Sequence, residues 1–436
     1  MSKRFATLCR ADAARTGVDA EILRARRAEL GPPEPDKWSP PRPRDAHEAT
    51  LAAGLYDLTA MKRRGGTLPA DSLIELDRQW WVEFKRRYYG YDKLYPKEFV
   101  CPRPISGKPA PVVRNGSPAE AGMKPDAVDT ISRACEAWVG ESGIGCALCV
   151  VRHGVVVINR AWGVQAGGPQ KGEPFTIDTP APLASTTKFL SAILLAEFAD
   201  RGLIGIDEPV DRYVAALRGA AAPARVPTVR DLFLHTAGFT GHWGDSLNDM
   251  EEVVADLYPT LEVWKTHRYQ GVGHALAGKI METMSGESIP RLFRRHLFEP
   301  LGVKSLRSDH TSYGSRGTAA DLAVIGQMML NGGAYGAMRF TSPDAIAQMM
   351  PIPGRDRFDP DKTIRWGVGS KLFDSDGLSD RHYGHSGAGG CFLKVDPAHD
   401  MVIAHTRHAE DSTYGNYHRN RAKMIASVLG AAQPGR

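Results

Sequence analysis

Residues 185–201 read Ser-Thr-Thr-Lys-Phe-Leu-Ser-Ala-Ile-Leu-Leu-Ala-Glu-Phe-Ala-Asp-Arg, and nine of the eleven residues from Phe189 to Ala199 are apolar. With Gly202 directly after it, this stretch predicts a helix that is buried on most sides and ends at the glycine. Lys188 lies one helical turn after Ser185, so its amine can reach the serine hydroxyl. Burial disfavours an ammonium ion and lowers its pKa. The stretch fits a serine nucleophile with a lysine as its proton acceptor, and taken alone it also fits a helix cap at Ser185 and a surface lysine at position 188.

Segments on both sides of this helix have the pattern of one sheet built from the two ends of the chain. Each end combines a helix with a β-hairpin: a helix at 125–139 and strands at 145–151 and 154–161, then strands at 391–395 and 401–405 and a helix at 417–429. The middle of the chain is mostly helical. We therefore predict an α+β fold, with an antiparallel sheet built from both chain ends, flanking helices and a helical subdomain.

The composition is that of an ordinary globular chain of 436 residues, with 42% hydrophobic and 24% charged residues. No apolar run is long enough to span a bilayer, and residues 1–17 lack a signal-peptide pattern, so we expect a cytoplasmic protein without a membrane partner. Lys and Arg outnumber Asp and Glu in residues 1–115, in short clusters such as Lys85-Arg86-Arg87. These clusters are interleaved with acids, so we expect solvated faces and no nucleic-acid partner.

Neither a metal nor a cofactor is expected. The six cysteines have no framework spacing, which fits a reducing compartment. Cys146 and Cys149 form a CxxC, but in a β-strand residues three apart point to opposite faces and do not share a ligand. The histidines of the C-terminal third have strand-like spacing without a zinc pattern. The sequence does not indicate the oligomeric state.

The first 114 residues read as a separate N-terminal extension, followed by a catalytic domain at 115–436. Residues 31–44 are proline-rich and predict an extended linker or strap. Residues 69–93 predict an amphipathic helix whose aromatic face includes Trp80 and Trp81. That face either docks onto the main body or forms a lid over a substrate pocket.

From about residue 115 to residue 430 the chain resembles the serine β-lactamase and penicillin-binding-protein superfamily, in particular the branch of class C-like β-lactamases, esterases and transesterases. Besides the Ser-x-x-Lys motif, the likeness is carried, in the order of that branch, by the stretches Leu203–Val210, Thr228–Gly238, Leu297–Gly302, Thr318–Leu322 and Tyr383–Gly390.

The resemblance implies roles for named residues. Ser185 is the expected nucleophile, Lys188 its proton acceptor, and Tyr269 matches the tyrosine of the family's Tyr-x-Asn motif. His385-Ser386-Gly387 stands in the place of the family's Lys-Thr-Gly, on a strand that lines the site. The resemblance also implies an oxyanion hole made by the backbone N–H groups of Ser185 and Ala388.

Two departures from the family pattern bear on the substrate. Gly271 stands where enzymes of β-lactam chemistry usually carry Asn, and His385 replaces a lysine that attracts a substrate carboxylate. An imidazole is mostly neutral at pH 7, so both changes weaken recognition of peptides and β-lactams. We therefore expect a serine carboxylesterase acting on a small ester. Acyl transfer or amide hydrolysis through the same acyl-enzyme, and a receptor without turnover, are the alternatives. Trp243 and Trp366 flank the motifs and are candidates for pocket walls or for the core.

Overall fold

A computed structural model describes Glu75, 78–79, 81–83, 85–87, 89–95, 99–214, Leu217, 225–239, Met250, Val254, Tyr258, 261–265, 267–351, 366–372, 377–408 and 417–433. By their internal contacts the residues fall into two compact units. Unit 1 combines Met1–Phe99 with Arg201–Leu292, and unit 2 combines Val100–Asp200 with Phe293–Arg436. Within the described residues, no helix has both the length and the apolar character needed to cross a membrane.

Unit 2 contains a six-stranded sheet in the order β11-β12-β13-β3-β4-β2. Its strands are β2 (Arg114–Asn115), β3 (Cys146–Arg152), β4 (Val155–Trp162), β11 (Tyr383–Ser386), β12 (Phe392–Asp396) and β13 (Met401–Arg407). Strand β13 pairs antiparallel with β3, with Ala404 opposite Cys149, so the two ends of the chain meet in the middle of the sheet. The predicted antiparallel sheet is confirmed for five strands, whereas the short edge strand β2 pairs parallel with β4.

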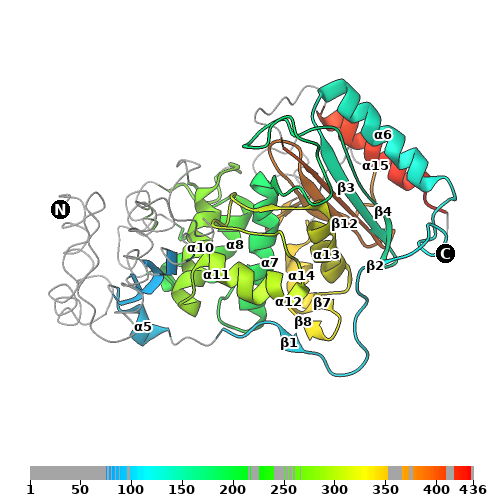
Figure 1. The fold of residues 1–436 in the computed structure, drawn as a ribbon. Helices are drawn as coiled ribbons and strands as arrows, with labels where there is room; N and C mark the ends of the chain where they lie inside the picture. Colours follow the sequence, from blue (N-terminus) through cyan, green and yellow to red (C-terminus); the bar gives the residue numbers. More distant parts are fainter. Residues whose placement is uncertain are drawn as a thin grey trace, which may run out of the picture. The chain divides into compact units, whose positions relative to one another are not determined.

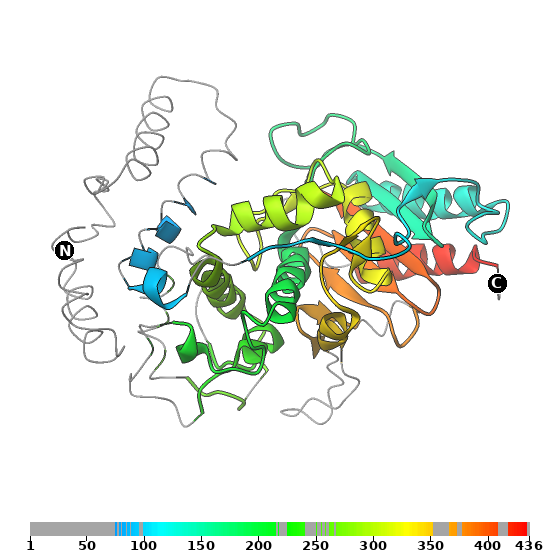
Figure 2. The ribbon, with the colours of Figure 1, turned by 90° about the horizontal axis from the view of Figure 1, so that it is seen from below.

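Helices cover both faces of this sheet (Figure 1). Helices α6 (Ala127–Ser142) and α15 (Tyr417–Gly430) lie side by side on one face, as the turned view in Figure 2 also shows. Helix α13 (Ala319–Leu330) packs on the other face, where a Cβ on Gly326 would lie 2.3 Å from a methyl of Val402. Because both faces are covered, every residue of β3 is buried.

Successive side chains of β3 point to opposite faces of the sheet, and only one set joins the buried cluster beneath α6 and α15. Leu148 and Val150 belong to this cluster, while Cys149 and Val151 are buried but lie outside it. Cys146 and Cys149 are three positions apart and thus point to opposite faces, and both are free thiols. The predicted burial of both cysteines is confirmed. Each large apolar side chain buried here stabilises the fold by about 1.5–3 kcal/mol.

Helix α7 (Thr187–Asp200) is the predicted apolar helix, and its residues from Thr187 to Phe198 are all buried. It is preceded by the 3-10 turn η1 (Ala184–Thr186), so the predicted start at Ser185 falls in this turn. Helix α14 (Pro343–Met349) packs against α7. Smaller elements of unit 2 are β1 (Arg103–Pro104), β5 (Ala181–Pro182), the π-helical η6 (Phe293–Phe298), α12 (Glu299–Leu301), β6 (Arg316–Gly317), β7 (Ala334–Tyr335), β8 (Met338–Arg339), β9 (Trp366–Gly367) and β10 (Ser370–Lys371).

The regular elements described in unit 1 are helices. They are α5 (Tyr91–Leu94), η2 (Val210–Arg212), α8 (Val229–Leu234), α10 (Val272–Ser285) and α11 (Ile289–Leu292). Helix α8 begins with a capping box between Thr228 and Asp231 and ends at His235, whose backbone is left-handed. Helix α10 begins after Gly271 and packs against α8.

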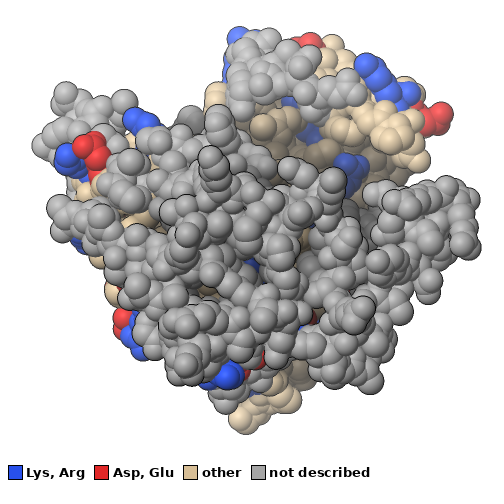
Figure 3. Space-filling view, turned by 90° about the vertical axis from the view of Figure 1, so that its left-hand side faces the viewer, with Lys and Arg blue, Asp and Glu red and all other residues tan. Residues whose placement is uncertain are grey.

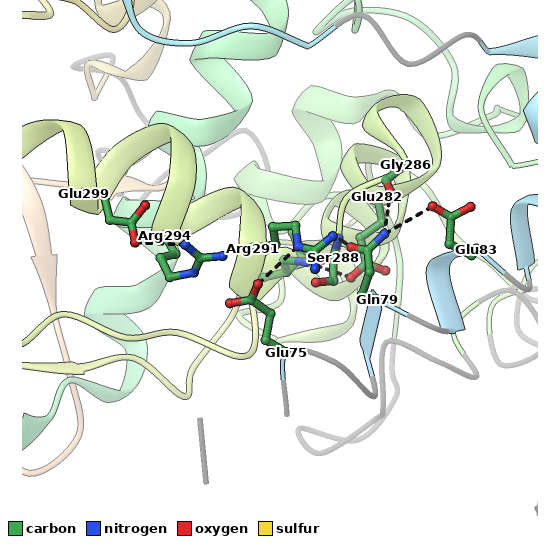
Figure 4. A network of polar contacts seen from close by, with 10 residues as sticks. Glu75, Gln79, Glu83, Glu282, Gly286, Ser288, Arg291, Arg294 and Glu299 are labelled. Carbon is green, nitrogen blue, oxygen red and sulfur yellow. Dashed lines mark hydrogen bonds and ion pairs between the residues drawn. The ribbon is translucent and has the colours of Figure 1, made fainter. Parts of the chain in front are cut away.

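Part of the N-terminal extension is docked within unit 1 (Figure 4). The helical residue Gln79 is 3% exposed. Its amide donates to the carbonyl of Gly286 at 2.9 Å and accepts the N–H of Ser288 at 2.8 Å, so one side chain joins the end of α10 to the approach to α11. Glu75 also pairs with Arg291 at 3.1 Å. Trp80 and the proline-rich segment 31–44 lie outside the described residues.

The Lys85-Arg86-Arg87 cluster does not form the solvated face that we expected. Lys85 and Arg86 are 3% and 2% exposed. The Arg86 guanidinium donates to the carbonyl of Tyr95, and the Lys85 ammonium lies 5.6 Å from the centre of the Tyr89 ring. On the face shown in Figure 3, the described Lys and Arg residues lie in small separate groups, several of them beside Asp or Glu.

Candidate active site

Ser185 lies half-buried in the turn η1, directly after an unusual backbone position. Ala184 has φ +45°, in the left-handed region that costs a non-glycine residue about 1–2 kcal/mol. The flanking chain is fixed by the antiparallel pair β5–β6 and by the hydrogen bond from the Leu183 N–H to the Ser315 carbonyl, at 2.8 Å. The surrounding structure thus holds the serine at a sharp turn that leads into α7.

The amine of Lys188 lies 3.5 Å from the Ser185 hydroxyl oxygen. It also donates to the backbone carbonyl of Ser312 at 2.7 Å. The lysine side chain is fully buried, and this burial lowers its pKa from 10.5 to about 7. Near neutral pH a large fraction of Lys188 is therefore uncharged and able to accept a proton from a nearby hydroxyl.

The carbonyl of Ser312 belongs to a loop that sequence reasoning did not identify. The loop is fixed to α7 by two hydrogen bonds: the Ser191 hydroxyl donates to the Thr311 carbonyl at 2.7 Å, and the Ser315 N–H donates to the Thr187 hydroxyl at 3.1 Å. The Ser312 N–H donates to Nδ1 of His310 at 3.0 Å. Because Lys188 is bound through a backbone carbonyl, no side-chain type at position 312 signals this contact in the sequence.

Strand β11 brings the His385-Ser386-Gly387 segment to the turn that carries Ser185. A Cβ on Gly387 would lie 2.1 Å from the Leu183 carbonyl oxygen, so only glycine fits where these two backbones meet. The Gly387 N–H donates to the Cys391 carbonyl at 2.7 Å and closes the turn after β11. Ala388 is exposed in this turn. Ser185, Lys188, His385, Ser386 and Gly387 therefore belong to one compact unit.

His385 is a buried, uncharged imidazole. Burial, helped by the positive charge of Lys188, lowers its pKa to about 3. Its Nδ1 donates to the carbonyl of Ser386 at 2.7 Å, because a carbonyl oxygen only accepts. The Trp366 ring lies 5.9 Å from the imidazole, so two residues that the sequence singled out as substrate-binding are in contact. Position 385 carries no fixed positive charge in the physiological pH range.

Tyr269 and Gly271 belong to unit 1, so their assembly with Ser185 stays a prediction. Tyr269 is half-buried, and its ring lies 4.6 Å from that of His235. Gly271 is buried at the start of α10, where its carbonyl accepts the Ala275 N–H at 3.0 Å. Trp243 lies outside the described residues.

The Beta-lactamase family model matches residues 133–422, a range that contains both the Ser-x-x-Lys helix and strand β11. The chain belongs to the Beta-lactamase family. Its fold and its serine-hydrolase class follow from this membership, and the predicted superfamily is confirmed.

Two curated relatives are similar to the chain over much of its length. Penicillin-binding protein 4 from Amycolatopsis lactamdurans is 26% identical over 281 residues, which cover 53% of this chain and 73% of the relative. A putative D-alanyl-D-alanine carboxypeptidase from Escherichia coli O157:H7 is 22% identical over 379 residues, which cover 69% of this chain and 86% of the relative.

Solved structures support the same fold. A penicillin-binding-protein homologue from Caulobacter crescentus superposes with a TM-score of 0.58 at 21% identity, over 71% of this chain and 99% of that one. A family VIII carboxylesterase superposes with the same TM-score, identity and coverage. The chain therefore shares its fold with a penicillin-binding-protein homologue and with a family VIII carboxylesterase.

Proposed function

We propose that this protein is a serine carboxylesterase that forms an acyl-enzyme on Ser185 from a small carboxylic ester. The observation that carries the proposal is the buried amine of Lys188, 3.5 Å from the Ser185 hydroxyl and with a pKa of about 7. A serine hydroxyl is a weak nucleophile until a nearby base takes its proton, and this amine is uncharged often enough to do so at neutral pH.

In the proposed reaction the Ser185 hydroxyl transfers its proton to the amine of Lys188 as its oxygen attacks the ester carbonyl carbon. The carbonyl oxygen becomes an oxyanion, which we assign to the backbone N–H groups of Ser185 and Ala388. The C–O bond to the alcohol then breaks, and the alcohol leaves with a proton returned from the Lys188 and Tyr269 pair. Water attacks the acyl-enzyme by the same route in reverse, which releases the acid and frees Ser185.

The neutral imidazole of His385 supports a substrate ester that carries no free carboxylate group. A fixed cation at this position would attract a substrate carboxylate, and burial keeps His385 uncharged down to a pH of about 3. Gly271 carries no side-chain amide to bind an acylamino group. The family VIII carboxylesterase among the structural neighbours fits this substrate class.

Amide hydrolysis is the second candidate, and the similarity to a putative D-alanyl-D-alanine carboxypeptidase favours it. The two candidates differ in the leaving group: a D-alanyl-D-alanine peptide releases a terminal D-alanine that carries a carboxylate, whereas a simple ester releases an alcohol. Comparing p-nitrophenyl acetate and butyrate with a D-alanyl-D-alanine peptide separates them. An added alcohol or amine acceptor, followed by product analysis, separates hydrolysis from acyl transfer.

The test of the proposal is labelling of Ser185 by a fluorophosphonate probe, located by mass spectrometry of the peptides. We expect labelling of the wild type and loss of labelling in Ser185→Ala and Lys188→Ala. Ser142→Ala is the matched control, since Ser142 is also half-buried in unit 2 but far along the chain in α6. An unlabelled wild-type protein that also fails to hydrolyse the p-nitrophenyl esters supports the receptor alternative and refutes the esterase.

A further inference from the structure

His235 binds the backbone on both sides of Tyr269. Its carbonyl accepts the Arg268 N–H at 2.9 Å, and its Nδ1 accepts the Gln270 N–H at 3.4 Å. Because a peptide N–H only donates, Nδ1 of His235 carries no proton in this arrangement. Residues 268 and 270 are thus both held by one residue, with Tyr269 between them.

The His235 ring also contacts the phenol ring itself. The two ring centres are 4.6 Å apart, and on α10 the His274 ring lies 5.1 Å from that of His235. Phe233 of α8 continues the series at 4.5 Å from His274. His235, His274 and Phe233 are at most 1% exposed, so a well-packed group of rings joins α8 and α10 and ends at the half-buried Tyr269.

The backbone of His235 is suited to this position but strained for most residues. It has φ +60° and ψ +31° at the end of α8, in the left-handed region. Glycine and asparagine adopt this conformation at low cost. Asparagine also places a side-chain oxygen at the δ position, where it can accept a hydrogen bond as Nδ1 does. His235→Gly therefore keeps the backbone conformation but removes the hydrogen-bond acceptor, whereas His235→Asn keeps both. Comparing the two variants isolates the effect of the acceptor.

We propose that His235 is a positioning residue for Tyr269: it orients the phenol by holding the peptide N–H groups of Arg268 and Gln270 and by packing against the phenol ring. This inference rests on the proposed acyl-enzyme function, in which the phenol takes part in proton transfer. His235 itself touches neither substrate nor reacting atoms in this role. A residue whose sole role was to end α8 would not need contacts with Arg268, Tyr269 and Gln270.

The experiment measures the hydrolysis of p-nitrophenyl butyrate by His235→Gly, His235→Asn, Tyr269→Phe and the two double variants. We expect Tyr269→Phe to lower kcat by about 100-fold or more, as for loss of a general acid-base group. His235→Gly should lower kcat by about 10- to 100-fold, because a small misplacement of a catalytic group has effects of this size. KM should change less than about twofold, and His235→Asn should recover part of the loss, because asparagine restores the acceptor but not the ring.

The double variants distinguish positioning from a merely structural role. If His235 acts through Tyr269, His235→Gly changes kcat less than about twofold in the Tyr269→Phe background. His153→Gly is the matched control, because His153 is also left-handed, with φ +53°, and is bonded through Nδ1 to Asp400. Its kcat should equal that of the wild type. Thermal unfolding of each variant shows that the fold is retained.

Two results would overturn the inference: effects of His235→Gly and Tyr269→Phe that multiply, or a His235→Asn variant as impaired as His235→Gly. Either can occur while the fluorophosphonate probe still labels Ser185 in the wild type, so the esterase would stand without the positioning role. A wild-type protein without any Ser185 labelling would instead refute the proposed function itself.

Discussion

Replacing the buried lysine by methionine should make the protein inactive but more stable. Methionine has a similar length and shape and is readily buried. Burial lowers the Lys188 pKa from 10.5 to about 7, a shift that corresponds to about 5 kcal/mol at pH values below 7. Lys188→Met also leaves the Ser312 carbonyl without its donor, which costs about 1–3 kcal/mol. We therefore expect a net gain of about 2–4 kcal/mol in the free energy of unfolding at pH 6.

The sign of the pH dependence follows from proton binding. Between about pH 7 and 10.5 the unfolded chain binds a proton at Lys188 and the folded chain does not, so the destabilising contribution of Lys188 shrinks as pH rises across this range. The advantage of Lys188→Met should shrink accordingly from pH 6 to pH 10. Urea unfolding at pH 6, 8 and 10, followed by circular dichroism, measures it, with equal m-values as a check on the comparison.

Lys423→Met is the matched control, since Lys423 is exposed on α15 and its ammonium lies 3.8 Å from Glu141. This variant should change the free energy of unfolding by less than about 1 kcal/mol at every pH. It should also keep full labelling of Ser185. A Lys188→Met variant that is less stable than the wild type at pH 6, or whose advantage is independent of pH, would refute the account of Lys188 as a destabilising buried amine.

Three further predictions concern the site and the fold. The rate of Ser185 acylation should rise with pH through a midpoint near 7, since the neutral amine of Lys188 is the proposed proton acceptor; a rate independent of pH between 5.5 and 8.5 in stopped-flow assays contradicts this. Gly387→Ala should lower the acylation rate at least about tenfold, because the new Cβ would lie 2.1 Å from the Leu183 carbonyl oxygen. The control Gly140→Ala in α6, where the space around the Cβ is open, should retain the wild-type rate. Gln79→Ala should lower the free energy of unfolding by about 1–3 kcal/mol, because the buried groups of Gly286 and Ser288 lose their partner; unchanged urea midpoints would show that this contact contributes nothing.

The sequence predicts those features that depend on local spacing. Helical periodicity locates α6 to within a few residues, and runs rich in β-forming residues locate the β3–β4 and β12–β13 hairpins equally well. The approach of Lys188 to Ser185 follows from helical geometry at a spacing of three. An imidazole with its ordinary pKa is mostly neutral at pH 7, so the sequence predicts an uncharged His385. Burial lowers its pKa and extends this uncharged state to more acidic pH.

The sequence does not predict contacts made by backbone groups that are distant along the chain. The carbonyl that holds Lys188 comes from a residue 124 positions further on, and a carbonyl is present at every position. The left-handed Ala184 has no sequence signal, because surrounding contacts impose it on a residue that disfavours it. Lys85 and Arg86 are buried beside the Tyr89 ring and the Tyr95 carbonyl, which lie nearby in the sequence, and charge counts do not show this burial.

The pairing of β13 with β3 has a consequence for the order of events during translation. Ribosomes complete β3 and α7 long before they reach β13, so the nascent strand β3 lacks its partner strand until β13 has been made. Contacts between such distant segments also close slowly, because the entropy of a long loop must be overcome first. We therefore expect a stalled nascent chain that lacks β12 and β13 to remain unreactive toward acyl probes, so that the polypeptide becomes reactive only after β13 has been made.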